Sequence, residues 1–289
     1  MLLQHLGLSW DTVKAIQNKY LHRHFSKPKF KRLRFLAIDK ISMGKKYKYL
    51  ILTIVYDLLI CAVVFIGNGK GVDALLPFWP SLKSLGASIE AVAIDMSHTY
   101  IEAVKNQLPK SIIIFDHFHV IKYFNDKLSE FRRQLYHDTK DILKKEILKG
   151  TRWLLLKNPE NLIANKKERE HLEQALQINK PLATAYYMKE ELRQIWHQSD
   201  QSTAHELLVN WVAKARSSGI NILIKFANTL SAHKTGILAY YNYRISTGPL
   251  EGTNNKIKTL QRQSYGFRDK EFFKLKIMAI HGSEYALIG

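Results

Sequence analysis

The chain has 289 residues, 46% hydrophobic and 11% aromatic, so it is a globular sequence long enough to bury a large core in one or two domains. Lys and Arg total 44 against 25 Asp and Glu, and the net charge of +19 favours a polyanionic partner, either nucleic acid or an acidic membrane face. The single cysteine, Cys61, excludes a disulfide scaffold within the chain and a cysteine-rich zinc module. The first ten residues lack the regions of a signal peptide, so we expect a reducing, cytoplasmic location.

The amino-terminal 26 residues have the pattern of a helix-turn-helix. A short apolar-periodic piece precedes a turn at Gly7, and Ser9 can cap a helix over residues 10–25 with Asp11 in its first turn. In a DNA-binding helix-turn-helix the second helix reads the bases. An ordinary helical hairpin has the same pattern.

A basic linker follows the predicted helix. Around Pro28 it carries five positive side chains, Lys27, Lys29, Lys31, Arg32 and Arg34. Such a segment is either a solvated linker or an arm that contacts DNA phosphates and adds affinity without sequence specificity.

Residues 49–67 imitate a membrane span, because they hold one charged residue, Asp57, in 19 positions. The segment is rich in β-branched and aromatic residues, and a charge at mid-bilayer costs about 3 kcal/mol. We therefore predict two strands, about 47–56 and 60–66, joined by a turn at Asp57, and no membrane partner.

Three apolar runs each end in an aspartate: 35–39, 91–95 and 112–116. Continuous apolar runs are typical of buried strands, and the segments between them, 75–85 and 99–107, are predicted to be helices. Ligands of open α/β sheets bind beyond the carboxyl ends of the strands, so the aspartates are expected to converge at one edge. Each aspartate alone could instead cap a helix or a turn, and Asp116 could cap a helix that starts near Phe118.

Two neighbouring motifs are weaker evidence for a function. The glycines in residues 67–71 lack the spacing of a phosphate-binding loop, so we interpret them as hinges between a strand and a helix. His117 and His119, two residues apart and without cysteines, are a poor structural zinc pattern. A histidine hydrogen-bonded near an acidic cluster is the better interpretation.

Residues 122–233 are predicted to be helical and basic, with breaks at Gly150, Asn158-Pro159, Lys180-Pro181 and 217–219. This block interrupts the α/β region and therefore has the character of an insertion. Its three tryptophans recur with Leu and Ile, and core packing is the expected role of Trp153, Trp196 and Trp211.

The segment from Ser246 to Lys256 opens another helix, which Ser246 or Thr247 can cap and Gly266 can end. Ile257 and Leu260 would point to a core. Gly252 weakens a helix, and close approach of a nucleic-acid backbone is one reason for it. One polar face of this helix carries Glu251, Asn255, Lys258 and Arg262, and Arg268 keeps the following region basic. Glu251 could alternatively serve only the helix dipole.

Two aspartates at strand ends and a glutamate on a helix are hard oxygen ligands, which suit Mg²⁺ or Mn²⁺. Two such ions about 4 Å apart can clamp the attacking and leaving oxygens of an in-line phosphoryl transfer. A positive surface that holds DNA and an acidic pocket that holds cations would then serve one reaction.

Four stretches resemble the DDE transposases of bacterial insertion sequences, and most closely the group written ISL-three: Ile38-Asp39 with Ile41-Ser42, residues 93–96, 115–120 and 246–258. The resemblance implies a ribonuclease-H-like α/β fold, a mixed sheet with flanking helices that is interrupted by a large all-helical insertion. It also implies DNA strand cleavage and joining. Carried over residue by residue, Asp39, Asp95 and Glu251 would be the metal-binding and catalytic triad, with Asp116 and His119 as an accessory Asp-x-x-His motif.

The resemblance also organises the chain. We expect a partial helix-turn-helix over 1–26, the first part of the catalytic core over 27–121, the helical insertion over 122–235, and closing helices with the acidic Glu251 over 236–289. Family members often carry Glu after the first Asp, whereas this chain has Lys40, which would point to the opposite face of the strand from Asp39. The missing first helix and cysteine cluster indicate an amino-terminally truncated copy.

The sequence thus predicts a transposase that uses two Mg²⁺ or Mn²⁺ ions on insertion-sequence ends and target DNA. We expect it to act in the bacterial cytoplasm on nucleoid DNA and to form a homo-oligomer when assembled on DNA. The alternatives are a catalytically inactive, truncated DNA-binding remnant and a ribonuclease-H-like nuclease without joining activity.

Overall fold

The computed structural model describes residues 9–26, 32–43, 50–163, 166–264 and 266–282. The chain divides into two compact units. We call Met1–Ile114 with Ile245–Gly289 the sheet unit, and Phe115–Arg244 the helical unit. The finer four-part division drawn from the sequence stays a prediction.

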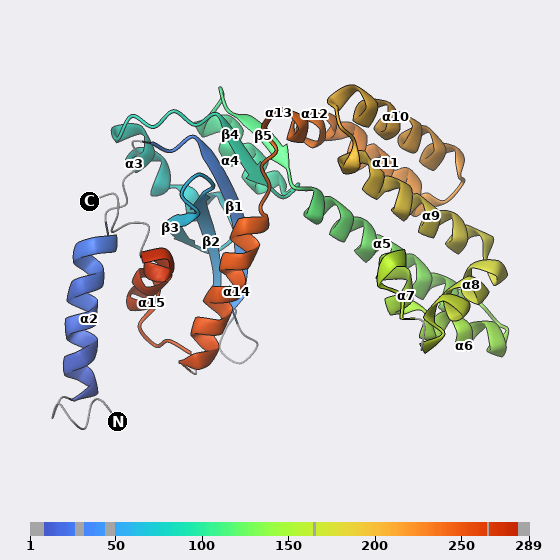
Figure 1. The fold of residues 1–289 in the computed structure, drawn as a ribbon, viewed down its shortest axis with the longest axis horizontal. Coiled ribbons are helices and arrows are strands. Elements are labelled where there is room, and N and C mark those ends of the chain that lie inside the picture. The colour runs from blue at the N-terminus through green and yellow to red at the C-terminus, as the bar shows by residue number, and fades with distance from the viewer. Residues whose placement is uncertain (1–8, 27–31, 44–49, 164–165, 265, 283–289) are drawn as a thin grey trace. The chain divides into compact units, whose positions relative to one another are not determined.

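A five-stranded mixed sheet forms the centre of the fold (Figure 1). The strand order is β3-β2-β1-β4-β5, with β1 antiparallel to β2, β2 antiparallel to β3, and β1 parallel to β4. The sequence expectation of a mixed α/β sheet is confirmed. The strands are β1 (Phe35–Met43), β2 (Leu50–Asp57), β3 (Ala62–Asn68), β4 (Ala91–Ile94) and β5 (Ile112–Phe115).

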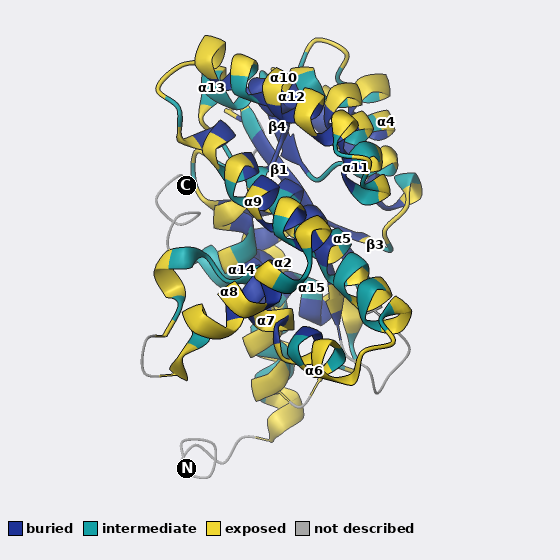
Figure 2. Ribbon diagram, turned by 90° about the vertical axis from the view of Figure 1, so that its right-hand side faces the viewer, coloured by how far each residue is buried: buried dark blue, intermediate teal, exposed yellow. Residues whose placement is uncertain are grey.

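The first half of β1 and all of β4 are buried on both faces, as their dark blue ribbons show in Figure 2. This explains why they read as continuous apolar runs instead of alternating ones. Beyond Ile38 the pattern of β1 changes to alternation, with Ile41 and Met43 buried and Lys40 and Ser42 exposed. The strand therefore runs four residues past Asp39, longer than the apolar run alone indicates.

Helices cover both faces of the sheet within the sheet unit. On one face, Ala37 and Ile41 of β1 belong to a hydrophobic cluster with Ile257 of α14 and Phe272 of α15. On the other face, the Phe65 ring of β3 lies 5.3 Å from that of Phe78 in α3. The helices are α2 (Trp10–Phe25), the 3₁₀ turn η1 (Val72–Leu75), α3 (Phe78–Ser84), α4 (His98–Gln107), α14 (Gly248–Gln263), α15 (Lys270–Met278) and the 3₁₀ turn η5 (Ala279–His281).

Helix α2 begins and ends where the sequence predicts. The Ser9 side chain accepts a hydrogen bond from the Thr12 backbone N–H at 3.1 Å, which satisfies one of the unpaired N–H groups of the first turn. Leu21 and Phe25 are buried in the cluster under the sheet, and Lys14 forms an ion pair with Asp269 at 3.0 Å. This helix is therefore packed onto α15. The preceding half of the predicted helix-turn-helix, residues 1–8, lies outside the described residues.

The helical unit contains helices and 3₁₀ turns over its described residues, as the sequence predicts. Its helices begin or end near the predicted breaks: α6 ends at Gly150, α10 ends at Ser217, and Pro181 lies in the first turn of α9. The elements are α5 (His117–Asp138), α6 (Ile142–Gly150), α7 (Arg152–Leu156), η2 (Pro159–Asn161), α8 (Glu168–Ile178), α9 (Lys180–Gln194), η4 (Ile195–His197), α10 (Gln201–Ser217), α11 (Asn221–Ala232), α12 (Lys234–Leu238) and α13 (Tyr240–Tyr243).

Aromatic side chains fill the core of the helical unit. Phe124 of α5, Trp211 of α10 and Phe226 of α11 pack edge to face, with ring centroids 4.8–5.9 Å apart. Trp211 and Trp196 are buried, as expected. The same expectation is wrong for Trp153, which is 64% exposed. An apolar run shows that a helix has a buried face but does not show which residue lies on it.

One further expectation needs correction, and the reason proposed for Gly252 stays a prediction. Residues 75–85 do not form one helix, because the chain leaves η1 at Leu75 and starts α3 at Phe78, with Pro77 at its N-cap position. Gly252 has open space around the place of a Cβ atom, so the protein's own packing does not require a glycine there. Among the described helices, none combines the length and the apolarity needed to cross a bilayer.

Candidate active site

Asp39, in the middle of β1, and Asp95, directly after β4, occupy matching positions on two neighbouring parallel strands. Ile38 lies opposite Ile94 in the register of β1 and β4, so the next residue on each strand is an aspartate. Asp39 is buried at 7% exposure, and the Asp95 side chain is 15% exposed. Parallel pairing of β1 with β4 brings these two aspartates to neighbouring positions, as the sequence predicts.

Asp95 is held by its own turn and by a lysine from β1. Its Oδ1 accepts the Ser97 backbone N–H at 2.9 Å, and its Oδ2 lies 3.3 Å from Lys40 Nζ. Lys40 is exposed between the buried Asp39 and Ile41, in keeping with a side chain on the opposite face from Asp39. Its ammonium nevertheless reaches Asp95, a contact that the sequence analysis did not anticipate.

Asp39 is tied to α14 through a buried hydrogen bond. Asn254 Nδ2 donates to Asp39 Oδ2 at 2.9 Å, and both residues are buried. Leu250 and Ile257 pack α14 into the cluster on the same side. Asn254 lies between them on this face, and an amide among apolar positions is the sequence signal that would have marked it as a functional residue.

Glu251 lies in the first turn of α14, one turn before Asn254. Its backbone N–H bonds to the Thr247 carbonyl at 2.9 Å, and Pro249 occupies the first turn, as the sequence predicts. The side chain is half-buried. A carboxylate there is also stabilised by the helix dipole, so both sequence interpretations of Glu251 are compatible with its position.

The three carboxylates do not converge on one point in this structure. Among the described residues, ligand atoms of Asp39, Asp95 and Glu251 do not all lie within 4.8 Å of one another. The sheet unit thus aligns two aspartates by strand register and anchors the glutamate helix to one of them, without joining all three.

A buried tyrosine is influenced by the negative charges of both aspartates. Tyr100 of α4 is fully buried, and its hydroxyl lies 3.1 Å from Thr53 Oγ1. Burial raises the pKa of Tyr100 to about 12, and the negative charges of Asp95 and Asp39 act in the same direction. This edge of the sheet therefore concentrates negative charge in a strongly basic protein.

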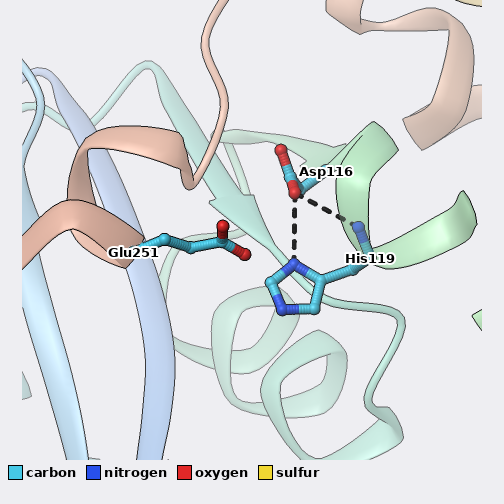
Figure 3. Close-up of side chains that lie close together, drawn as sticks. All are labelled: Asp116, His119 and Glu251. Carbon is cyan, nitrogen blue, oxygen red and sulfur yellow. Dashed lines mark hydrogen bonds and ion pairs between the residues drawn. The ribbon is translucent and has the colours of Figure 1, made fainter. Parts of the chain in front are cut away.

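Asp116 and His119 form a local pair at the start of α5. Asp116 is the N-cap, and its Oδ2 accepts from the His119 backbone N–H at 3.3 Å and lies 3.1 Å from His119 Nδ1 (Figure 3). Because an ionised carboxylate only accepts, His119 Nδ1 is the donor. Asp116 thus has the predicted capping role and also orients the imidazole.

The predicted DNA-binding side chains have different settings. Asn255, Lys258 and Arg262 are exposed along α14, and Arg268 and Arg32 are exposed as well. Arg34 is exposed but forms a two-point ion pair with Glu90, with Nη2 3.0 Å from Oε2. This pair holds the pKa of Glu90 below its usual value. Lys27, Lys29 and Lys31 lie outside the described residues.

Comparisons with known proteins show a transposase family over most of the chain. The model of a family described as Transposase, of the DDE ISL3 type, matches residues 36–277. The chain is 34% identical to the transposase for insertion sequence element IS1001 of Bordetella parapertussis, over 94% of this chain and 67% of the relative. It is 26% identical to the transposase for insertion sequence element IS1557 of Mycobacterium tuberculosis, over 98% of this chain and 68% of the relative.

Proposed function

Since this chain belongs to the ISL3 family of DDE transposases, we propose that it cleaves DNA strands at the ends of an insertion sequence and joins them to target DNA. One observation carries the proposal. Two aspartates occupy matching positions on neighbouring parallel strands, and the helix that bears Glu251 is bonded to one of them through Asn254.

The fold supports a ribonuclease-H-like catalytic core. The order β3-β2-β1-β4-β5, with the first three strands antiparallel and β4 parallel to β1, gives a mixed sheet with helices on both faces. The all-helical residues 115–244 enter the chain between β5 and α14. In this proposal they are the insertion that precedes the catalytic Glu251.

Asp39, Asp95 and Glu251 would hold two Mg²⁺ or Mn²⁺ ions. Carboxylate oxygens are the ligands that these hard cations prefer. Asp39 and Asp95 each face a group that compensates a negative charge, the Asn254 amide and the Lys40 ammonium. A bound cation would supply more of the same compensation, so the residues present fit the proposed metal.

Asp116 and His119 would serve as accessory residues. Together they offer one carboxylate and one imidazole, both side chains that can bind a divalent metal ion. The Asp116 carboxylate fixes the tautomer of His119 and leaves Nε2 as the ring nitrogen with a lone pair. We propose that this pair assists Glu251 during strand cleavage.

The bound ions would activate water or a 3′-hydroxyl and stabilise charge on the scissile phosphate. The protein itself positions the metal-binding carboxylates. Strand register sets Asp39 and Asp95, and Asn254 holds both the Asp39 carboxylate and, through α14, the first turn that carries Glu251. Cleavage adds water across a phosphodiester bond and leaves a 3′-hydroxyl on one side and a 5′-phosphate on the other. In joining, that 3′-hydroxyl attacks a target phosphodiester: a new bond to the phosphorus forms, the target's own bond from phosphorus to its 3′ oxygen breaks, and a target 3′-hydroxyl is released.

The basic surface would hold the substrate. We propose that the exposed Asn255, Lys258 and Arg262 of α14 and the nearby Arg268 contact DNA phosphates, with Arg32, Arg34 and the preceding lysines as an additional arm. Assembly of copies of the chain on paired element ends is part of this proposal.

Nicking of element-end DNA in the presence of Mg²⁺ or Mn²⁺ tests the function. Asp39→Asn, Asp95→Asn and Glu251→Gln should each lower the nicking rate by 10³-fold or more, on the order expected when a metal ligand is lost, and leave DNA affinity nearly unchanged. Asp126→Asn, an exposed carboxylate on α5, is the control and should nick normally.

The outcomes separate the alternatives. Nicking that survives all three substitutions would refute the triad. DNA binding without any nicking by the unmodified protein would identify a DNA-binding remnant. Nicking without transfer of the 3′ end to a second DNA would identify a nuclease that lacks joining activity.

A further inference from the structure

Trp153 of the helical unit is an exposed tryptophan next to buried neighbours. Leu154 and Leu155 of α7 are buried, whereas Trp153 is 64% exposed. The Arg152 guanidinium lies over its ring at 4.6 Å from the centroid. A large exposed indole has no role in the core of this unit, and exposed aromatic side chains of this kind mark binding surfaces.

Three arginines gather beside this tryptophan. Arg132 and Arg133 lie on α5 and Arg152 on α7, and the charges of Arg133 and Arg152 both act on Arg132. None of the three forms an ion pair within the described part of the chain. Burial and then repulsion from the other two lower the pKa of Arg132. Positive charge is thus concentrated here, although the charge of Arg133 also acts on Glu130, which is ion-paired with Lys127.

Arg132 is built into the fold. Its Nη1 donates to the Leu148 carbonyl at 2.8 Å, which ties α5 to the end of α6. Its Nε–H is buried and has no hydrogen-bond acceptor among the described residues. A buried N–H without an acceptor costs free energy, so the fold keeps this positive charge in place at a cost to its stability.

More basic and apolar side chains continue the same surface on α6. Lys144 and Lys149 are exposed, and Lys145 lies over the Tyr136 ring at 5.7 Å from the centroid. Ile142 and Leu143 at the start of α6 are 74% and 73% exposed. In Figure 1, α6 and α7 lie along the carboxyl-terminal half of α5.

We propose that Arg132, Arg133, Arg152 and Trp153 form a second DNA-contact surface on the helical unit, which binds backbone phosphates. We call it the arginine surface. Guanidinium groups pair with phosphate oxygens at two points, and a flat aromatic ring packs against sugars and bases. An acidic protein partner would neutralise the charges of the arginines, but its acidic groups would make no use of the exposed indole of Trp153. The inference rests on the proposed function, in which DNA is the substrate.

Fluorescence anisotropy with labelled duplex DNA at several salt concentrations tests the arginine surface. The variant Arg133→Ala/Arg152→Ala removes the two exposed charges and keeps Arg132, which supports the fold. Two lost phosphate contacts should reduce the slope of log affinity against log salt by about 1.8, and affinity near physiological salt should fall roughly tenfold or more. Trp153→Ala should weaken binding and leave the salt slope unchanged.

The control Arg169→Ala/Lys180→Ala removes two exposed charges from other helices of the same unit. It should keep the salt slope of the unmodified protein. Equal slopes for the two double variants would overturn the arginine surface. So would an unchanged DNA affinity together with loss of self-association in sedimentation, which would identify an interface between copies.

The two proposals fail in different ways. If the unmodified protein does not bind or nick element-end DNA, the proposed function fails. If it nicks normally and the arginine variants bind like the control, only the arginine surface fails.

Discussion

Asn254 donates a 2.9 Å hydrogen bond from Nδ2 to Asp39 Oδ2, across 215 positions of the chain and between two buried residues. This bond links the end of β1 to α14, the helix that carries Glu251. Asp39 is a buried carboxylate in a water-poor setting, where a lost donor is costly. The bond therefore serves stability and also positions the site.

Asn254→Ala should lower the free energy of unfolding of the sheet unit by about 2 kcal/mol, the usual range for a hydrogen bond to a charged group. The matched control is Asn255→Ala on the exposed face of the same helix, which should change it by less than about 0.5 kcal/mol. Urea titration of both variants checks this. Equal midpoints for the two would show that the bond does not stabilise the fold.

Lys40→Met should increase the affinity for Mn²⁺ in the absence of DNA. The Lys40 ammonium lies 3.3 Å from Asp95 Oδ2 and competes with a cation for the same carboxylate. Because Lys40 is 46% exposed, solvent screens the pair, so its removal should cost stability only about 0–1 kcal/mol and raise metal affinity roughly fivefold.

Isothermal titration of Mn²⁺ into the apo protein measures the effect of Lys40. Lys83→Met removes another lysine of the sheet unit, one whose Nζ contacts Gln107 on the surface. It should bind Mn²⁺ like the unmodified protein. Equal affinities for the two variants would mean that Lys40 is not a competitor at Asp95.

Local signals in the sequence were enough for most elements. Ser9 caps α2 and Asp116 caps α5. Apolar runs mark β1 and β4, which are largely buried on both faces, and also the edge strand β5, in which only Ile114 and Phe115 are buried. The alignment of Asp39 with Asp95 followed from parallel pairing at strand ends. These features depend on a few neighbouring residues or on a general rule of α/β sheets.

The features that could not be predicted from the sequence depend on contacts between distant segments. The Lys40–Asp95 and Asn254–Asp39 contacts exist only once β1, β4 and α14 are packed, so no local pattern contains them. Trp153 lies in the same apolar run as the buried Leu154, and periodicity over a five-residue helix cannot tell the two apart. The partners of α7, on α5 and α8, decide which side is covered.

Stability of the sheet unit should depend on pH through Asp57. Burial raises the pKa of Asp57, and backbone hydrogen bonds from Leu59 and Ile60 only partly oppose this. The folded-state pKa thus exceeds the unfolded value of about 3.9. The favourable contribution of the protonated form is complete below the unfolded pKa and is lost as pH rises through the folded pKa.

Asp57→Asn should therefore stabilise the protein increasingly as pH rises from about 4 to about 7, since the amide can still accept from the Leu59 N–H as Asp57 Oδ1 does at 2.8 Å. Urea midpoints of both proteins across this range measure the difference. A difference that stays constant, or that shrinks with rising pH, would contradict the assigned shift.

Lys189→Met should destabilise the helical unit by about 3 kcal/mol, because it strips buried acceptors of their donor. Lys189 is fully buried, and its Nζ donates to the Leu155 and Lys157 carbonyls at 2.9 Å each. Lys214→Met, which breaks an exposed ion pair with Glu191, should cost less than about 1 kcal/mol. Thermal unfolding of the two variants tests the contrast, and similar losses would show that burial of Lys189 carries no special weight.

Gly67 has a steric role that explains why a glycine stands at the end of β3. A Cβ atom at this position would lie 1.9 Å from the Ala74 carbonyl oxygen of η1, which is backbone and cannot swing aside. Gly67→Ala should therefore separate β3 from η1 and cost about 3 kcal/mol. Gly71→Ala is the matched control, because its Cβ would meet only the Asp73 backbone nitrogen at 3.9 Å and its φ is −86°. Restricting the unfolded chain should leave that variant neutral or about 0.5 kcal/mol more stable. Urea unfolding of both alanine variants decides the matter. If they lose stability equally, the glycines act through flexibility, as hinges, and the close approach of β3 to η1 does not require Gly67.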